Sequence, residues 1–289
     1  MILRDYPVKA LILQQDQPCK TAVMRHMPFL LGVLILAFSA CKQPAEEEIP
    51  SLSVKIMEFK ATAGNCVDPE TPCYEMHLQY PQVEGGPEDA RTKINAALND
   101  TILDSFAAFA PDENSHFNTL GDVASAIETM FNDYLTDFED MHQKWFIRMT
   151  SETQLNHPMV LSVSMQIESY TGGAHANHWK NIFNFDPVTG SAISWQDVIS
   201  DPVAFLNLSE EAFRKTRDIP PSTNLEEAGF FFENGQFSLP ENIGFTDAGI
   251  LQIFNPYEAA AYALGSTRYT IPWENVQSML SQKYRGFVE

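Results

Sequence analysis

Helix-type and strand-type apolar patterns occupy separate blocks of this chain, and this grouping is what most limits its possible folds. Strands predicted from period-two alternation are joined or followed by helices with apolar residues every three to four positions. The expected strands span 54–62, 74–80, 161–167, 179–186, 235–239, 243–254 and 266–273, and the expected helices span 85–109, 121–141, 194–217 in two pieces broken near Asp201-Pro202, and 273–284. Grouped elements predict an α+β fold in which antiparallel sheets carry helices on one face, in two packed halves.

The two central helices have clear buried faces. In the first, Ile94, Leu98, Ile102 and Phe106 recur at spacing four after Pro87, a residue tolerated in the first turn of a helix. In the second, we expect one core-facing stripe made of Val123, Ile127, Met130, Phe131, Tyr134, Leu135 and Phe138. The strand at 161–167 should keep a solvent-exposed face with Ser162, Ser164, Gln166 and Glu168 on it.

A short apolar run near the start predicts export. Arg25 precedes the run from Phe29 to Phe38, which is about half the roughly 20 residues that a spanning helix needs. Small residues then lead into Cys41, an arrangement that resembles a bacterial lipobox, in which the cysteine receives acyl chains (such as palmitate) and becomes the first mature residue. An ordinary signal peptide or membrane anchor with a chance cysteine is the alternative. Translation is expected to start at Met24.

These features divide the chain into four predicted parts. Residues 1–41 are the leader and signal peptide, 42–52 a flexible tether, 53–155 an N-terminal α+β half and 156–289 a C-terminal α+β domain. We expect the lipid-anchored product in the cell envelope. The residue after the lipid cysteine is Lys42, whereas an Asp at this position favours retention in the inner membrane of enteric bacteria. The outer membrane is therefore the favoured location if the cell has an outer membrane.

The charge of the predicted mature chain limits the classes of molecule that it can bind. Removal of residues 1–41 takes away four basic and two acidic residues, which leaves 14 basic and 36 acidic residues and a formal net charge of −22. Such a surface repels phosphates, so nucleic acid is excluded as a partner and a cationic partner is favoured.

Two cysteines remain for the folded part of an exported protein. Cys66 and Cys73 flank a turn between the first two expected strands, and in an oxidising compartment a disulfide across this loop is the leading prediction. A metal-binding pair and two free thiols are the alternatives.

The segment between the strands at 161–167 and 179–186 is the candidate binding site. Its glycines permit a sharp turn, and amphipathic aromatic residues beside a turn are typical of binding hot spots. His175 is either a hydrogen-bonding post that holds the loop or a contact at its tip. The predicted partner-binding residues are Tyr170, Thr171, Gly172, Gly173, His175, Asn177, His178 and Trp179.

A metal site, a catalytic nucleophile and a phosphate-binding loop are less favoured at this segment. His175 and His178 have a spacing that could place two imidazoles on one metal, but only on a helix, and a third ligand such as His157 or Asp186 would have to come from elsewhere. Ser169 and Thr171 lack the strand-to-helix elbow of a catalytic nucleophile, and the glycines do not precede a helix as in a phosphate loop. We therefore expect no metal, no cofactor and no catalytic residue.

Three stretches carry a resemblance to a known family. "YTGGAH" at Tyr170–His175, "DPVTG" at Asp186–Gly190 and the residues from Asn255 to Gly265 resemble the envelope domain of the lysozyme-sensing anti-sigma factor RsiV and are similar to the accessory domain of the peptidoglycan deacetylase PdaC. The resemblance covers roughly residues 53–285. It implies an extracytoplasmic α+β binding module, without the deacetylase catalytic domain and without a sigma-binding segment.

The leading functional expectation is a non-enzymatic envelope lipoprotein. It would be attached to the lipid bilayer through Cys41 and would bind lysozyme, another protein or peptidoglycan through the loops around Tyr170–His178. An envelope glycan hydrolase that uses paired carboxylates is the first alternative. A purely structural lipoprotein is the second.

Overall fold

The computed structural model describes residues 51–68, 70–110, 116–138 and 143–287. These residues fall within one compact unit, Glu47–Glu289. The predicted lipid site Cys41, the leader and residues 42–50 of the predicted tether lie outside the described residues. None of the helices within the described ranges has the length and apolar character needed to cross a lipid bilayer.

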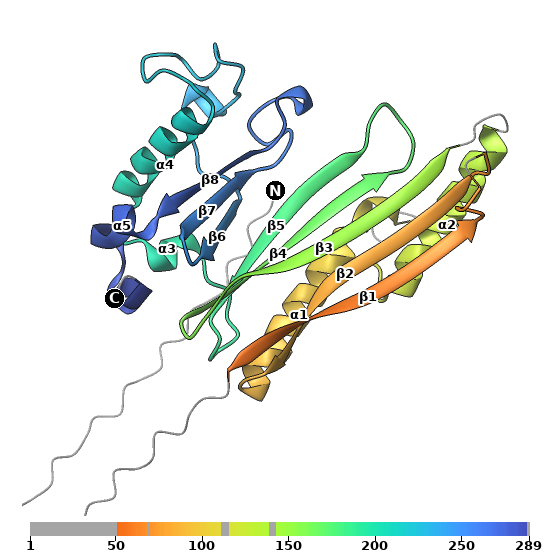
Figure 1. Ribbon diagram of the computed structural model, residues 1–289, viewed down its shortest axis with the longest axis horizontal. Coiled ribbons are helices and arrows are strands. Elements are labelled where there is room, and N and C mark those ends of the chain that lie inside the picture. Colours follow the sequence, from red (N-terminus) through yellow and green to blue (C-terminus); the bar gives the residue numbers. More distant parts are fainter. Residues whose placement is uncertain (1–50, 69, 111–115, 139–142, 288–289) are drawn as a thin grey trace, which may run out of the picture. The chain divides into compact units, whose positions relative to one another are not determined.

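The first part of the chain forms a five-stranded sheet in the order β1-β2-β3-β4-β5 (Figure 1). All neighbouring pairs are antiparallel except β2 and β3, which are parallel because the chain returns through two helices before it re-enters the sheet. The prediction of a purely antiparallel sheet is therefore wrong at this one pair. The strands are β1 Leu52–Gly64, β2 Cys73–Gly85, β3 Lys144–His157, β4 Val160–Tyr170 and β5 Asn177–Phe185.

Both helices of this part, α1 (Glu88–Asp104) and α2 (Leu120–Asp137), cover one face of the sheet (Figure 1). Thr119 begins α2 with a capping box, in which its side chain and that of Asp122 bond to each other's backbone N–H groups. The predicted apolar faces are largely buried. Met130 and Phe138 are exceptions, since 40% and 53% of their surfaces are exposed.

The face of β4 that points away from α1 and α2 is only partly solvent-exposed: Gln166 is exposed as predicted, but the two serines are not. Ser162 and Ser164 are buried because β6 packs against this side of β4. Each serine keeps a hydrogen bond: the Ser162 hydroxyl donates to Asn184 Oδ1 at 2.7 Å, and the Ser164 hydroxyl oxygen accepts from the Gln154 amide at 2.9 Å. Polar residues in period-two alternation thus face a second packed layer.

The second part of the chain builds a three-stranded antiparallel sheet in the order β6-β7-β8. The helical segment at 194–217 is broken at Asp201-Pro202 as predicted, into α3 (Trp195–Val198) and α4 (Pro202–Thr216). Phe213 of α4 lies at the centre of an aromatic cluster with Phe230, Phe232, Phe237 and Phe254. The strands are β6 Asn242–Thr246, β7 Gly249–Phe254 and β8 Thr267–Pro272, with short 3-10 turns η1 Ala107–Phe109, η2 Glu233–Gly235 and η3 Tyr262–Leu264.

Two predicted elements in this part are wrong. Residues 235–239 form no strand, since Phe237 inserts its ring into the aromatic cluster while the main chain stays outside the sheet. The helix expected at 273–284 is broken into α5 (Trp273–Val276), η4 (Gln277–Met279) and η5 (Gln282–Phe287). The break follows from pairing with the segment after α3: Ser200 N–H donates to Met279 O, and Ser281 N–H donates to Val198 O.

The first sheet continues well beyond the predicted boundary at residues 155 and 156, which falls inside β3. The β3–β4 hairpin is shared between two cores. Leu155 and Val160 belong to the core of the C-terminal part, whereas Leu161 and Val163 belong to the core beneath α1 and α2. The two halves therefore share a strand pair instead of meeting at a linker.

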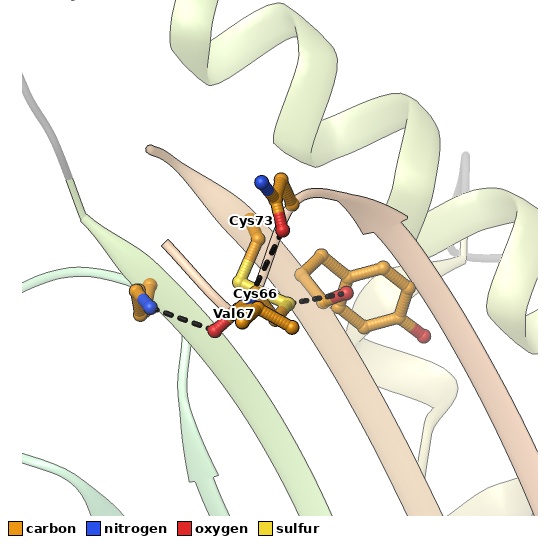
Figure 2. The surroundings of a disulfide bond; sticks show 6 residues. Cys66, Val67 and Cys73 are labelled. Carbon is orange, nitrogen blue, oxygen red and sulfur yellow. Dashed lines mark hydrogen bonds between the residues drawn. A yellow bond between two sulfur atoms is a disulfide. The ribbon is translucent and has the colours of Figure 1, made fainter. Parts of the chain in front are cut away.

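The predicted disulfide is present. Cys66 and Cys73 are bonded across the loop that joins β1 and β2, with their Cα atoms 5.2 Å apart (Figure 2). Asp68 organises this loop by accepting hydrogen bonds from the Thr71 hydroxyl and the Glu70 N–H, and these bonds, the Thr71 bond above all, lower the pKa of the Asp68 carboxyl. Lys144, the first residue of β3, donates to the Cys66 carbonyl oxygen at 2.9 Å.

Candidate functional site

The loop between β4 and β5 has the sharp turn that its glycines predict. Gly172 and Gly173 have φ values of +97° and +101°, which residues with a Cβ rarely adopt. Tyr170 closes the turn by donating its hydroxyl hydrogen to the Gly173 carbonyl oxygen at 3.1 Å, and its ring stacks on Phe146 of β3. These contacts make Tyr170, Gly172 and Gly173 the framework of the loop.

His175 lies on an aromatic residue from the C-terminal part of the chain. Its ring stacks on Tyr262 of η3 with 3.8 Å between ring centroids and 13° between the planes. The Tyr262 hydroxyl donates to the Ala176 carbonyl oxygen at 2.6 Å, and His175 Nδ1 lies 3.0 Å from the same oxygen. His175 is nevertheless exposed, so its geometry agrees with both of its predicted roles, a post for the loop and a contact at its surface.

A pocket of about 420 Å³ opens beside this stack. The end of α1 and η1, the β4–β5 loop and the connection between β7 and β8 all contribute to its wall. Four predicted residues line it, together with several that the sequence analysis did not select, two of which are tyrosines. The four are Thr171, Asn177, His178 and Trp179, and the two tyrosines are Tyr257 and Tyr262.

Tyr257 is the most informative of the residues that were missed. It is 60% exposed and has a φ of +69°, a backbone conformation that costs about 1 to 3 kcal/mol for a residue with a side chain. Its ring lies 5.5 Å from that of Tyr262. Exposed aromatic residues on a strained backbone cluster at binding sites. The sequence signal was the "NPYEAAAY" stretch itself, which contains two tyrosines between two predicted strands.

The connection between β7 and β8, which contains Tyr257 and Tyr262, is stabilised by hydrogen bonds to a partly buried carboxyl group. Glu258 accepts hydrogen bonds from the N–H groups of Asn255 and Glu241, at 2.7 and 2.8 Å. Burial raises the pKa of the Glu258 carboxyl, although these two bonds oppose the change. Both oxygens of Glu258 thus hold the loop, and the carboxyl belongs to the support of the pocket.

The residues considered as metal ligands lie apart and have other partners. In the described ranges, no three His, Cys, Asp or Glu side chains gather closely enough to hold a metal ion. His157, one proposed third ligand, stacks on Phe287 and accepts from Met159 N–H. Asp186, the other, pairs with Lys283 Nζ at 2.8 Å; burial opposes ionisation of Asp186, but this ion pair and two backbone N–H donors lower its pKa overall.

Other hollows exist on the surface. Two of them, of about 490 and 530 Å³, lie along α4. They share the lining residues Glu211 and Lys215, charged side chains of opposite sign that are typical of a solvated helix face. The pocket beside His175 remains the candidate site because the predicted residues and the aromatic residues from distant parts of the sequence converge there.

Comparisons with known proteins agree with the predicted resemblance. The family described as "Deacetylase PdaC" matches residues 67–178, and the family described as "Protein of unknown function (DUF3298)" matches residues 196–274. The PdaC match thus lies on the part of the chain that forms α1, α2 and most of the five-stranded sheet, and the DUF3298 match lies on the C-terminal part. No protein of curated function matches the sequence.

Solved structures show the same fold. A DUF3298 family member from Bacteroides fragilis superposes with a TM-score of 0.57 at 21% identity, over 80% of this chain and 94% of that one. A DUF3298 family protein from Pseudomonas aeruginosa PAO1 superposes with a TM-score of 0.56 at 14% identity, over 81% of this chain and 96% of that one. The chain therefore contains one region similar to the PdaC family and one similar to the DUF3298 family of unknown function, and it shares the fold of solved DUF3298 proteins.

Proposed function

We propose that this protein is a non-enzymatic binding module of the bacterial cell envelope. Acylated Cys41 holds it at a lipid bilayer, with the outer membrane as the favoured location. The pocket beside His175 binds a lysozyme-like protein or a peptidoglycan fragment. This proposal rests on the sequence features around Cys41 and on the geometry of the pocket.

The composition of the pocket wall is the observation that carries the proposal. Aromatic faces of Trp179, Tyr257 and Tyr262 stand beside the hydroxyl of Thr171 and the amide of Asn177. Mostly apolar walls with a few polar groups are typical of binding pockets, and Tyr and Trp supply much of the binding energy at interfaces. The described residues that line the pocket include no Asp, Glu, Lys or Arg. A hydrolase with paired carboxylates would require acidic groups there.

The net charge of −22 for residues 42–289 complements a cationic protein such as lysozyme. Such attraction accelerates association and weakens as salt screens it. A peptidoglycan fragment, in contrast, would depend mainly on contacts in the pocket. The salt dependence of binding therefore separates the two partners.

The test is a binding measurement with residues 42–289, which contain the whole compact unit. Lysozyme and soluble peptidoglycan fragments are passed over the immobilised protein at low and high salt. Tyr257→Ala should weaken binding by about tenfold or more, as expected for an aromatic hot spot. Phe231→Ala is the matched control, because Phe231 is 57% exposed but does not line the pocket.

Each other outcome has a definite meaning. Retention of neither partner would remove the specific form of the proposal. Equal binding by both variants would move the binding site away from the pocket. Turnover of peptidoglycan that a single Asp or Glu substitution abolishes would support the hydrolase instead.

A further inference from the structure

Strand β5 lies at the edge of the five-stranded sheet, and no further strand of that sheet pairs with its outer side. In an antiparallel sheet, the N–H and C=O of every second residue point away from the neighbouring strand. Along β5 these are the even-numbered residues: the main chain of Lys180 and Ile182 bonds to side chains outside the sheet, and the Asn184 carbonyl oxygen accepts from Ile193 N–H. The edge continues through His178 to Ala176, which precedes the strand.

Side-chain carboxamides cover this edge at two successive positions. The carboxamide of Asn255 makes a two-point contact with Lys180, accepting from its N–H at 2.8 Å and donating to its carbonyl oxygen at 2.9 Å. Asn242 Oδ1 accepts from Ile182 N–H at 3.1 Å. At the far end, the Tyr262 hydroxyl bonds to the Ala176 carbonyl oxygen.

His178 lies between the positions covered by Asn255 and Tyr262. The alternation places its N–H and C=O on the same open edge, and no hydrogen bond joins either group to another residue in the described ranges. His178 lines the pocket, together with Trp179, Tyr257 and Tyr262. A residue that lines the pocket therefore has one main-chain donor and one main-chain acceptor without a partner among the described residues, spaced like the pair that Asn255 occupies at Lys180.

We propose that His178 is a docking position for a primary carboxamide of the bound partner, which makes the two-point contact that Asn255 makes one step along the strand. The ligand's carbonyl oxygen accepts from His178 N–H, and its NH₂ group donates to the His178 carbonyl oxygen. This inference rests on the proposed binding function and adds the chemical group that the pocket recognises.

Other groups fit this position less well. A secondary amide in the trans form directs its N–H and C=O to opposite sides, so one such group cannot satisfy both atoms of His178. A carboxylate has no donor and would place an anion against the His178 carbonyl oxygen. An extended peptide strand would need the neighbouring edge positions too, but Asn255 and Tyr262 already occupy Lys180 and Ala176.

The first experiment follows the backbone amide of His178 by NMR in residues 42–289. Benzamide is the probe, because it joins a primary carboxamide to an aromatic ring that suits the aromatic wall. It should move the His178 amide proton downfield in a saturable way, as a new hydrogen bond does. N,N-dimethylbenzamide and benzoate can accept from this N–H but have no N–H to donate to the His178 carbonyl oxygen, so each should move the proton much less than benzamide does at the same concentration. An equal response to all three, or to none, overturns the inference.

The second experiment removes the donor itself. His178→Pro eliminates the N–H at an edge position, where proline is tolerated because no ladder hydrogen bond is lost. His178→Ala is the matched control, since it removes the imidazole and keeps the N–H. Because the imidazole itself lines the pocket and lies edge-on to Tyr262, the two variants are compared with each other: benzamide affinity should be about fivefold or more lower in His178→Pro than in His178→Ala. Equal losses in both variants contradict the inference; if His178→Pro does not fold, the three-ligand comparison decides.

A third measurement separates this inference from the proposed function. Benzamide in excess should displace whichever partner, lysozyme or peptidoglycan, is retained through the pocket. If a partner is retained in a Tyr257-dependent way and benzamide does not displace it, the binding function stands and the carboxamide inference fails. If neither partner is retained and benzamide still moves the His178 amide, the recognition chemistry stands and the proposed partners fail.

Discussion

Gly190 allows the turn after β5 to form and to pack closely against α1. It ends the turn after β5 with a φ of +70°, and a Cβ at this position would lie 2.6 Å from the Ala90 carbonyl oxygen and 2.8 Å from its Cα. Ala90 lies in the first turn of α1, so the glycine lets the turn approach the helix. The sequence analysis predicted the turn from its glycine but could not predict the contact with α1.

We expect Gly190→Ala to lower the free energy of unfolding by about 2 to 4 kcal/mol, because it combines backbone strain with a clash against main-chain atoms. Gly235→Ala is the control, since Gly235 has a φ of +68° but nothing within 4 Å of its missing Cβ. This variant should lose only about 1 kcal/mol. Urea unfolding of the two variants measures the difference, and equal losses would show that the approach to Ala90 is unimportant.

At the scale of elements, the β1–β2 hairpin depends on its disulfide. The bond closes a loop with a sequence separation of 7 residues, for which the loss of chain entropy predicts a stabilisation of about 2 to 3 kcal/mol. We expect the double variant Cys66→Ser, Cys73→Ser to unfold at correspondingly lower urea. Dithiothreitol should destabilise the wild type by a similar amount and leave the variant unchanged. A wild type that is insensitive to the reductant would show that the bond adds little.

Hairpins and helices with local signals were predictable from the sequence, whereas elements that depend on distant partners were not. The β1–β2 and β4–β5 hairpins, both long helices and the α3–α4 break follow from periodicity, turn residues and proline. The strand β3 was missed, although Ile147 and Met149 alternate with the polar residues Arg148 and Thr150. Its parallel pairing with β2, and the break after α5, arise from main-chain bonds to distant segments that no local pattern reports.

The residues of the candidate site also fall into a group that was predictable from the sequence and a group that was not. The β4–β5 loop and the first residues of β5 contribute the four predicted lining residues, which were selected because glycines, histidines and aromatic residues gather there in the sequence. Tyr257 and Tyr262 come from a connection some 80 residues later. Only the packing of the second sheet against β5 brings them to the loop, so their place in the pocket could not be read from spacing.

At the scale of the whole molecule, a buried polar contact joins the two sheets. The Asn184 amide of β5 donates to the Ile243 carbonyl oxygen of β6 at 2.8 Å, while Asn184 Oδ1 accepts from Ser162. Asn184→Ala would leave both partners buried without these bonds. We expect a loss of about 2 to 3 kcal/mol in the free energy of unfolding.

Asn181→Ala is the control, because Asn181 lies on the same strand and its side chain makes no hydrogen bond to the described residues. It should change stability by no more than about 0.5 kcal/mol. Urea unfolding of both variants is followed by circular dichroism. If Asn184→Ala is as stable as Asn181→Ala, the contact between the sheets does not contribute to stability.

The shared β3–β4 hairpin has a consequence for how such proteins can be recombined during evolution. A gene segment that encodes only residues 196–274 would arrive in a new host protein without Leu155 and Val160, two side chains that fill its interior. A successful transfer would have to include the hairpin, and with it most of the preceding sheet. We therefore expect the two segments to be inherited as a pair, with sequence drift confined to their loops.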